Sequence, residues 1–380
     1  MSLIYIIIAV AFIDTFSQLP IIAPFAISLG ASPLLVGIII GMYSLSNIAG
    51  NIFSGIWIDR IGAKKVLFLG MLAVGIIVFF YSLVINPYQL AFIRFAHGIA
   101  GGFIVPAAFT LLGTKAKRKS SGKTMAFSGA SVGTAAIIGP ALGAIISVRL
   151  GYEWLFFIVA FFMILFGFLA LFFLNEKPIK KYEGMTGEPQ EKFILSIKKP
   201  LLYAYLAIFL LLFSLGTLTF SLPLKIEELL INAQMTGVLF STFGITAILF
   251  FLLPTNKLFD KQKKSLLMTL GLITISTALL FLAISFTMWH LVISMVVYGI
   301  GFAFLFPSAS AVVIECSRES ERGKAFGVFY ACFSLGVVAG SFISGFLALA
   351  PSLLFLVSAS IILTILFILS LFSKVFLRIN

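Results

Sequence analysis

The sequence predicts an all-α membrane protein with twelve transmembrane helices in two pseudo-symmetric six-helix bundles, and with both termini in the cytoplasm. Of the 380 residues, 61% are hydrophobic and only 10% are charged, whereas a soluble domain is nearer half apolar and a quarter charged. The apolar runs are continuous over about 20 residues, while a membrane β-barrel would alternate over about 10. This composition excludes secreted toxins, cytosolic enzymes and disordered regulators.

Charged residues, glycines and prolines separate the apolar runs and set the expected limits of the spans. The first run starts beside the N-terminus without the basic segment of a signal peptide, so we expect it to be the first span. The expected spans are residues 3–29, 33–57, 65–85, 88–112, 124–147, 152–174, 201–223, 233–253, 265–287, 289–313, 324–347 and 352–372.

The basic residues predict the orientation. If the N-terminus is inside, 23 of the 26 Lys and Arg residues fall in cytoplasmic segments, Arg149 and Lys225 fall outside, and Arg94 lies within a span. This split follows the positive-inside rule. It also explains the formal charge of +13 without a nucleic-acid partner.

The longest polar stretch, residues 175–200, separates six spans from six. We therefore expect an N-terminal bundle over residues 1–174, a cytoplasmic linker over residues 175–200 and a C-terminal bundle over residues 201–380. The halves match at a constant offset of 201, which places Pro106 on Pro307 and Gly139 on Gly340. Parallel repeats of this kind occur in transporters that bind substrate between their halves and alternate access.

The loop after the second expected span combines an acid, several cations and glycines. It contains Gly55, Asp59, Arg60, Gly62, Lys64 and Lys65. This pattern resembles the loop 2–3 signature of the major facilitator superfamily, G-x-L-A-D-R-x-G-R-R. The resemblance implies that the loop braces the closed cytoplasmic mouth, where Asp59 would meet the start of the eleventh span. The alternative is an ordinary basic cytoplasmic loop.

Two further spans resemble signatures of the same family. Arg94 and His97 in the fourth span are similar to R-x-x-Q-G-x-G, with His97 where the family often has Gln. The fifth span is similar to the glycine-rich motif of the twelve-span drug:proton antiporter branch. Its residues are Gly129, Gly133, Gly139, Pro140 and Gly143. Glycines one turn apart also let helices pack closely in any membrane bundle.

Asp14 and Arg94 are the charged residues deep within the expected spans, and His97 can become charged. Acids inside a membrane are costly and point to function. One hypothesis is therefore that Asp14 loads and releases a proton with Arg94 and His97 beside it. The alternative is that Asp14 and Arg94 form a permanent structural ion pair. His97 either titrates or hydrogen-bonds like the Gln that it replaces.

The substrate cavity is expected near Gln18, on the same helix face as Asp14. Aromatic candidates for its wall are Phe16, Phe25 and Phe213. Two candidate ligands, Asp14 and His97, do not make a metal site. No phosphate-binding G-x-x-x-x-G-K-[ST] motif occurs, so we expect neither a cofactor nor ATP-driven transport.

Together these features predict a secondary active transporter that exports a small hydrophobic or cationic molecule by proton-coupled alternating access. The expected partners are that substrate, protons and the lipid bilayer of a prokaryotic plasma membrane, and the expected state is a monomer. An importer, or a sugar or metabolite exporter, on the same fold is an alternative. An intramembrane enzyme is a remote one, because the sequence lacks a catalytic set.

Overall fold

The computed structural model describes residues 2–115, 121–176, 199–252, 262–317 and 322–371. These residues form helices and no strands. The first half contains α1 (Ser2–Ser17), α2 (Ile22–Ser28), α3 (Pro33–Ile61), α4 (Ala63–Tyr81), α5 (Pro87–Gly101), α6 (Ile104–Lys115), α7 (Ser121–Leu150) and α8 (Tyr152–Phe173). The second half contains α9 (Lys199–Glu228), α10 (Gln234–Leu252), α12 (Lys264–Ala283), α13 (Met288–Cys316), α14 (Arg322–Leu347) and α15 (Pro351–Leu371).

Ten described helices are long and apolar enough to cross a bilayer, and the bent pair α1 and α2 raises the number to eleven. The expected span at 233–253 coincides with α10, whose apolar part, Gln234–Phe250, is shorter. The prediction of many membrane-spanning helices is therefore confirmed. A total of twelve, and the cytoplasmic position of the termini, remain predictions.

Two spans that the sequence predicts as continuous are broken. The first turns by 47° between α1 and α2, where Pro20 lacks the amide hydrogen that a helix interior needs. The fourth breaks between α5 and α6 at Gly102. A side chain at Gly102 would lie 2.6 Å from the backbone nitrogen of Asn51, so only glycine allows this approach to α3.

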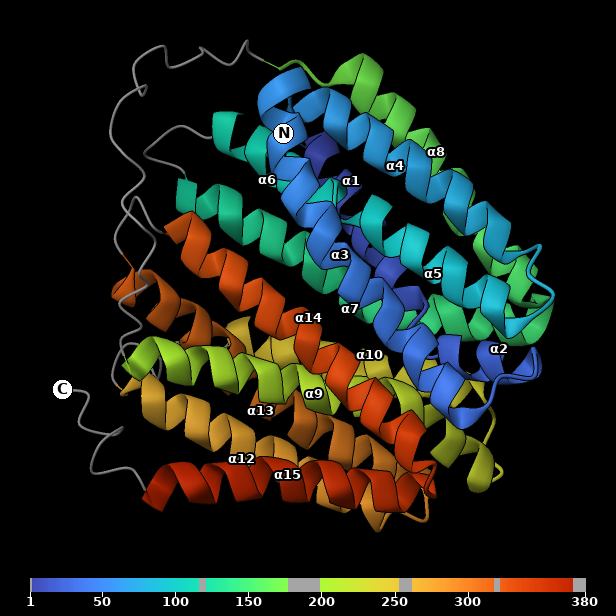
Figure 1. Cartoon of the computed structure of the whole chain (residues 1–380), viewed down its shortest axis with the longest axis vertical. Coiled ribbons are helices and arrows are strands. Elements are labelled where there is room, and N and C mark those ends of the chain that lie inside the picture. Colours follow the sequence, from blue (N-terminus) through green and yellow to red (C-terminus); the bar gives the residue numbers. More distant parts are fainter. Residues whose placement is uncertain (1, 116–120, 177–198, 253–261, 318–321, 372–380) are drawn as a thin grey trace.

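The helices form two groups, each around its own core (Figure 1). One core consists mainly of residues from α1–α8, with Phe220 and Leu354 added from the second half. The other consists of residues from α9–α15, with Leu19 packed against it. The boundaries expected at 174/175 and 200/201 fall just after α8 and just inside α9, and residues 177–198 between them lie outside the described part.

The packing between the halves repeats with the period expected from the sequence. Gly37 of α3 lies against the backbone of Ser341 on α14, and Gly237 of α10 lies against the backbone of Pro140 on α7. Gly237 follows Gly37 by 200 positions, and Ser341 follows Pro140 by 201. The two contacts are thus related by the internal repeat.

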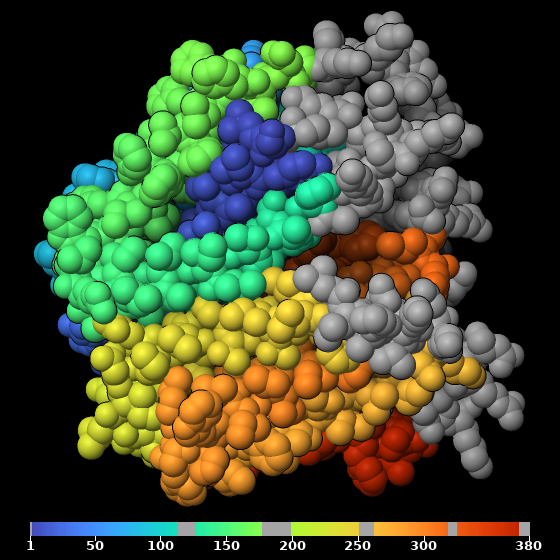
Figure 2. Space-filling model, turned by 180° about the vertical axis from the view of Figure 1, so that it is seen from behind, coloured from blue at the N-terminus to red at the C-terminus, as the bar shows by residue number. Residues whose placement is uncertain are grey.

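The halves meet closely at one face of the bundle. We call the face that carries Ser2 and Leu371 the terminal face and the opposite face, which carries Leu347, the distal face. Gly345, near the distal end of α14, packs against the Pro33 carbonyl at the start of α3, and from there the two helices diverge toward the terminal face (Figure 1). α7 and α10 form the second seam, visible from behind (Figure 2).

Toward the terminal face the same helices have open space around them. An added side-chain carbon at Gly55 of α3, Gly129 of α7 or Gly327 of α14 would have no atom of the described residues within 4 Å. Together with the divergence of α3 and α14, this indicates that the halves pack closely at the distal face and stand apart toward the terminal face (Figure 1).

Candidate functional site

The break after α1 places two polar side chains one turn apart in the interior of the first half. Asp14 and Gln18 are each 3% exposed. The Gln18 side-chain amide donates to Asp14 Oδ1 at 2.9 Å. Because a buried carboxylate needs such donors, this bond stabilises Asp14 in its buried position.

α5 brings the second member of the site to the same carboxylate. His97 is fully buried, and its Nε2 lies 3.0 Å from Asp14 Oδ2. Both carboxylate oxygens therefore have a partner, Gln18 on one side and His97 on the other. The contact places His97 beside Asp14, as the proton-loading hypothesis requires.

Arg94, one turn before His97, reaches Asp14 only through Gln18. Its Nη1 donates to Gln18 Oε1 at 2.8 Å, while Nε and Nη2 donate to the carbonyl oxygens of Ile39 and Ile40 at 3.3 and 3.4 Å. Among the described residues no ion pair joins Arg94 to Asp14. The direct structural pair considered as an alternative is replaced by a chain of hydrogen bonds.

Two tyrosines that the sequence analysis missed complete the cluster. The Tyr81 hydroxyl, at the end of α4, lies 3.0 Å from His97 Nδ1. The Tyr43 ring lies against the Arg94 guanidinium at 5.0 Å and packs edge-on against His97. A tyrosine within an apolar span signals such a role, because its hydroxyl needs a partner when buried, but its neighbours depend on the tertiary fold.

The contacts of His97 are mutually consistent in one tautomer. If Tyr81 donates its hydroxyl hydrogen to Nδ1, Nε2 carries the ring hydrogen and donates to Asp14. We name Asp14, Gln18, Tyr81, Arg94 and His97 the buried network. Its one carboxyl group, that of Asp14, contacts both His97 and Gln18.

The second half has a neutral counterpart of this network. Tyr298 follows His97 by 201 positions, and its hydroxyl lies 2.8 Å from the Ser214 hydroxyl. Ser214 follows Asp14 by 200 positions. Both residues are fully buried. The repeat thus keeps a buried polar pair but places its acid in the first half alone.

The aromatic residues proposed for the cavity lie in different surroundings. Phe16 is partly exposed and follows Asp14 on α1. Phe25 is buried, with the rings of Tyr152 and Phe156 at 4.8 and 5.4 Å. Phe213 is also buried and stacks on Phe209. The contacts of Phe25 are those of a core residue, and the cavity role of all three stays a prediction.

The loop motif is exposed at the terminal face. The side chains of Asp59, Arg60 and Lys65 are exposed, and no ion pair of Asp59 is found in the described residues. Lys64 is half-buried. The partner expected for Asp59, around Gly323 and Lys324, falls where side chains are outside the described part.

Gly62 supports a contact that the sequence did not predict. Its φ of +90° is a conformation that favours glycine, and it starts α4. Glu176, just beyond α8, accepts hydrogen bonds from the backbone N–H groups of Ala63 and Lys64 at 2.8 and 3.1 Å. A carboxylate at a helix N-terminus is stabilised by the helix dipole. The loop is thereby fastened to the end of α8.

The glycine motif of α7 has two functions in packing. Gly139 and Gly143 lie against Phe16 and Ser17, the residues that follow Asp14 on α1. Gly133 instead faces Ile248 of α10, while Gly129 has open space around it. The carbonyl of Pro140 also contacts Gly237 of α10. α7 therefore connects the helix of Asp14 to the second half.

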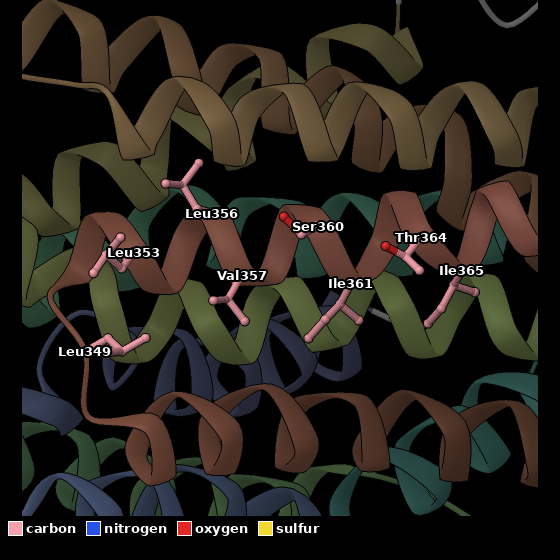
Figure 3. Close-up of a pocket in the computed structure, with 8 residues that line it drawn as sticks. All are labelled: Leu349, Leu353, Leu356, Val357, Ser360, Ile361, Thr364 and Ile365. Atoms are coloured by element: carbon pink, nitrogen blue, oxygen red, sulfur yellow. The ribbon is translucent and has the colours of Figure 1, made fainter.

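No metal centre is evident among the described residues, and the groove along α15 does not have the form of a substrate site. No group of three His, Cys, Asp or Glu side chains gathers there. A groove of about 440 Å³ runs along α15, and all its lining side chains come from that helix and from Leu349 before it (Figure 3). Because one exposed helix face supplies the whole groove, it does not have the convergent polar groups of a substrate site.

Known proteins similar to this chain are transporters. Multidrug resistance protein MdtG of Escherichia coli O9:H4 (strain HS) is 27% identical over 314 residues, which cover 80% of this chain and 75% of the relative. Multi-drug resistance efflux pump PmrA of Streptococcus pneumoniae serotype 4 is 25% identical over 332 residues, which cover 84% of this chain and 82% of the relative.

A solved structure of nucleoside transporter NupG superposes with a TM-score of 0.77 at 16% identity and covers 96% of each chain. This likeness shows the fold alone. The family model described as Major Facilitator Superfamily matches residues 4–226 and 204–378, which together span nearly the whole sequence. The chain therefore belongs to the Major Facilitator Superfamily and is a multi-pass transporter of the cell membrane, not an enzyme.

Proposed function

We propose that the protein exports a small hydrophobic or cationic molecule in exchange for protons, by alternating access, and that Asp14 carries the proton. The observation that carries the proposal is the buried network, in which a carboxylate 3% exposed contacts a fully buried histidine. Such an acid inside a membrane protein marks an ion or proton pathway by default.

A proton on Asp14 changes the contacts of the network. The charged carboxylate accepts hydrogen bonds from Gln18 and His97. Once protonated, it holds these donors less strongly, because hydrogen bonds to an ionised acceptor are roughly twice as strong as neutral ones. Gln18 also accepts from Arg94, so the effect extends from α1 to α5.

The route from Asp14 to the second half is short. Phe16 and Ser17, two and three residues after Asp14, pack on Gly139 and Gly143 of α7. The same stretch of α7 contacts Gly237 of α10 through Pro140. We infer that a change in charge at Asp14 alters the seam between the halves. This seam must open at the distal face before the interior becomes accessible from the distal side.

The multidrug relatives support the substrate class. Their names describe a multidrug resistance protein and an efflux pump. The neutral second half also supports it, because the paired hydroxyls of Ser214 and Tyr298 offer no charge to an anionic substrate. A single carboxylate that alternately holds a proton or attracts a cation is the simplest arrangement for exchange.

The test is transport in proteoliposomes with an imposed pH gradient. When the vesicle lumen is acidic and the outside is alkaline, wild-type protein should concentrate ethidium inside the vesicles, because protons leave as ethidium enters. Asp14→Asn should lose this accumulation and keep exchange of labelled for unlabelled ethidium, because the alternating fold is intact. Glu153→Gln, altered at the exposed start of α8, is the matched control and should still accumulate ethidium. Accumulation by Asp14→Asn at the wild-type level would refute Asp14 as the proton carrier.

A further inference from the structure

A second cavity lies between the halves near the distal face, away from the buried network. Its volume is about 580 Å³, which falls in the range of roughly 300–1,000 Å³ found for small-molecule sites. The first half supplies the connection between α1 and α2, α2 itself and parts of α7 and α8, and the second half supplies the end of α9 and the start of α10. We name it the distal pocket.

The distal pocket has an enclosed floor and an open rim. Floor residues such as Ile21, Ala144 and Ile226 are at most 3% exposed, whereas Leu230 at the rim is 95% exposed. A molecule can therefore enter from the distal side and bury apolar surface against the floor. Burying an apolar group in such a pocket is favourable by about 25 cal/mol per Å².

One charged side chain lines the distal pocket, the carboxylate of Glu227. No hydrogen bond or ion pair to this carboxylate occurs in the part of the chain that the structure describes. The nearby Lys225 does not neutralise it, because Lys225 is 2% exposed and is held by Glu228 and Ser352 at 3.4 and 2.7 Å. Tyr152 places an aromatic ring in the same wall.

We propose that the distal pocket binds an organic monocation with an apolar body, with Glu227 as its counter-charge. The lone carboxylate attracts a positive group, and the Tyr152 ring favours a cation over its face. A bare Ca²⁺ or Mg²⁺ ion requires about six oxygen ligands, which an apolar wall with one acid does not offer. Apolar walls with a few placed polar groups are instead typical of sites for organic ligands.

Occupancy of this pocket is coupled to the conformation. Both halves contribute to the wall, so the pocket exists in this form only while the halves meet at the distal face. A ligand that binds one conformation more tightly shifts the population toward it. The cation therefore holds the transporter closed at the distal face. The inference does not rest on proton coupling, because the pocket shares no residue with the buried network.

The experiment measures binding of radiolabelled tetraphenylphosphonium to the full-length protein in nanodiscs. All variants carry Asp14→Asn, so that any binding at the transport site is the same in every sample and does not depend on a proton at Asp14. Glu227→Gln should weaken tetraphenylphosphonium binding at the distal pocket about 5- to 10-fold, which is the effect of losing one charge contact at a partly exposed site. Glu228→Gln, one residue away and outside the pocket, is the matched control and should bind like its parent, because Lys225 stays held by Ser352 at 2.7 Å. Neutral triphenylphosphine oxide should compete poorly.

A second readout follows the conformation. Spin labels at Leu83→Cys and Phe286→Cys, in a background with Cys316→Ser and Cys332→Ser, report the distance between the distal ends of the halves. Tetraphenylphosphonium should raise the population with the short distance, and Glu227→Gln should abolish this response. Equal binding and equal distances for Glu227→Gln and Glu228→Gln would overturn the proposal, as would neutral and cationic probes of equal affinity.

Discussion

Replacement of Tyr81 by Phe tests whether the buried network works as a unit. The ring is kept, so no cavity forms, and only the hydroxyl that lies 3.0 Å from His97 Nδ1 is removed. His97 is fully buried, so Nδ1 is left without a partner. Loss of one partner from a buried polar group costs about 1–3 kcal/mol. This destabilises both the fold and the orientation of the imidazole toward Asp14.

The repeat provides a matched control at the equivalent position. Tyr298→Phe removes a hydroxyl that lies 2.8 Å from Ser214. The Ser214 hydroxyl still donates to the Leu211 carbonyl, so we expect a smaller loss, about 1 kcal/mol. The second half carries no acid in its polar pair, so this variant should keep proton coupling.

The assay has two parts. Thermal unfolding in nanodiscs measures stability, and we expect both variants to unfold at a lower temperature than wild type. Ethidium accumulation driven by a pH gradient measures coupling, and only Tyr81→Phe should lose most of it relative to passive exchange. If Tyr298→Phe lowers coupling as much as Tyr81→Phe, or if Tyr81→Phe couples like wild type, the network is structural and does not carry the proton.

Three more variants probe other parts of the molecule. Arg94→Ala should impair transport more than Arg94→Lys, because alanine leaves Gln18 and two backbone carbonyls without their cation; equal uptake rates would contradict this. Gly143→Ala should cost roughly 1–3 kcal/mol of stability through overlap with the Ser17 carbonyl, while Gly129→Ala, with open space around it, should melt like wild type. Asp59→Asn should lengthen the distances between labels in the loops after α3 and α13, because it favours the conformation that is open at the terminal face. An unchanged distance distribution would leave Asp59 without a role in closure.

The sequence predicts the helices well because each span must be apolar along its length. The break of the first span is harder to predict, since Pro20 is compatible with a kink as well as with a turn. The spacing of Asp14 and Gln18 already places them on one helix face. At the surface the sequence is less informative. Glu176 lies in a polar stretch expected to be a linker, but in the structure its side chain caps the start of α4.

Contacts within the site depend on the tertiary fold. Asp14, Arg94 and His97 stand out in the sequence because they are polar within apolar spans, yet the sequence does not show that Gln18 separates the two charges. Tyr81 comes from another helix, and its approach to His97 depends on how α4 packs against α5. Periodicity along one helix contains no information about that packing.

The most direct test of the proton-carrying role of Asp14 is to measure proton release when substrate binds. Purified wild-type protein in weakly buffered solution, followed with a pH-sensitive dye, should release up to about one proton for each ethidium bound, because the two compete for Asp14, the one acid buried in the described part of the first half. Asp14→Asn should bind ethidium and release none. Release of a full proton by Asp14→Asn would contradict the central claim that this carboxylate exchanges its proton for the substrate.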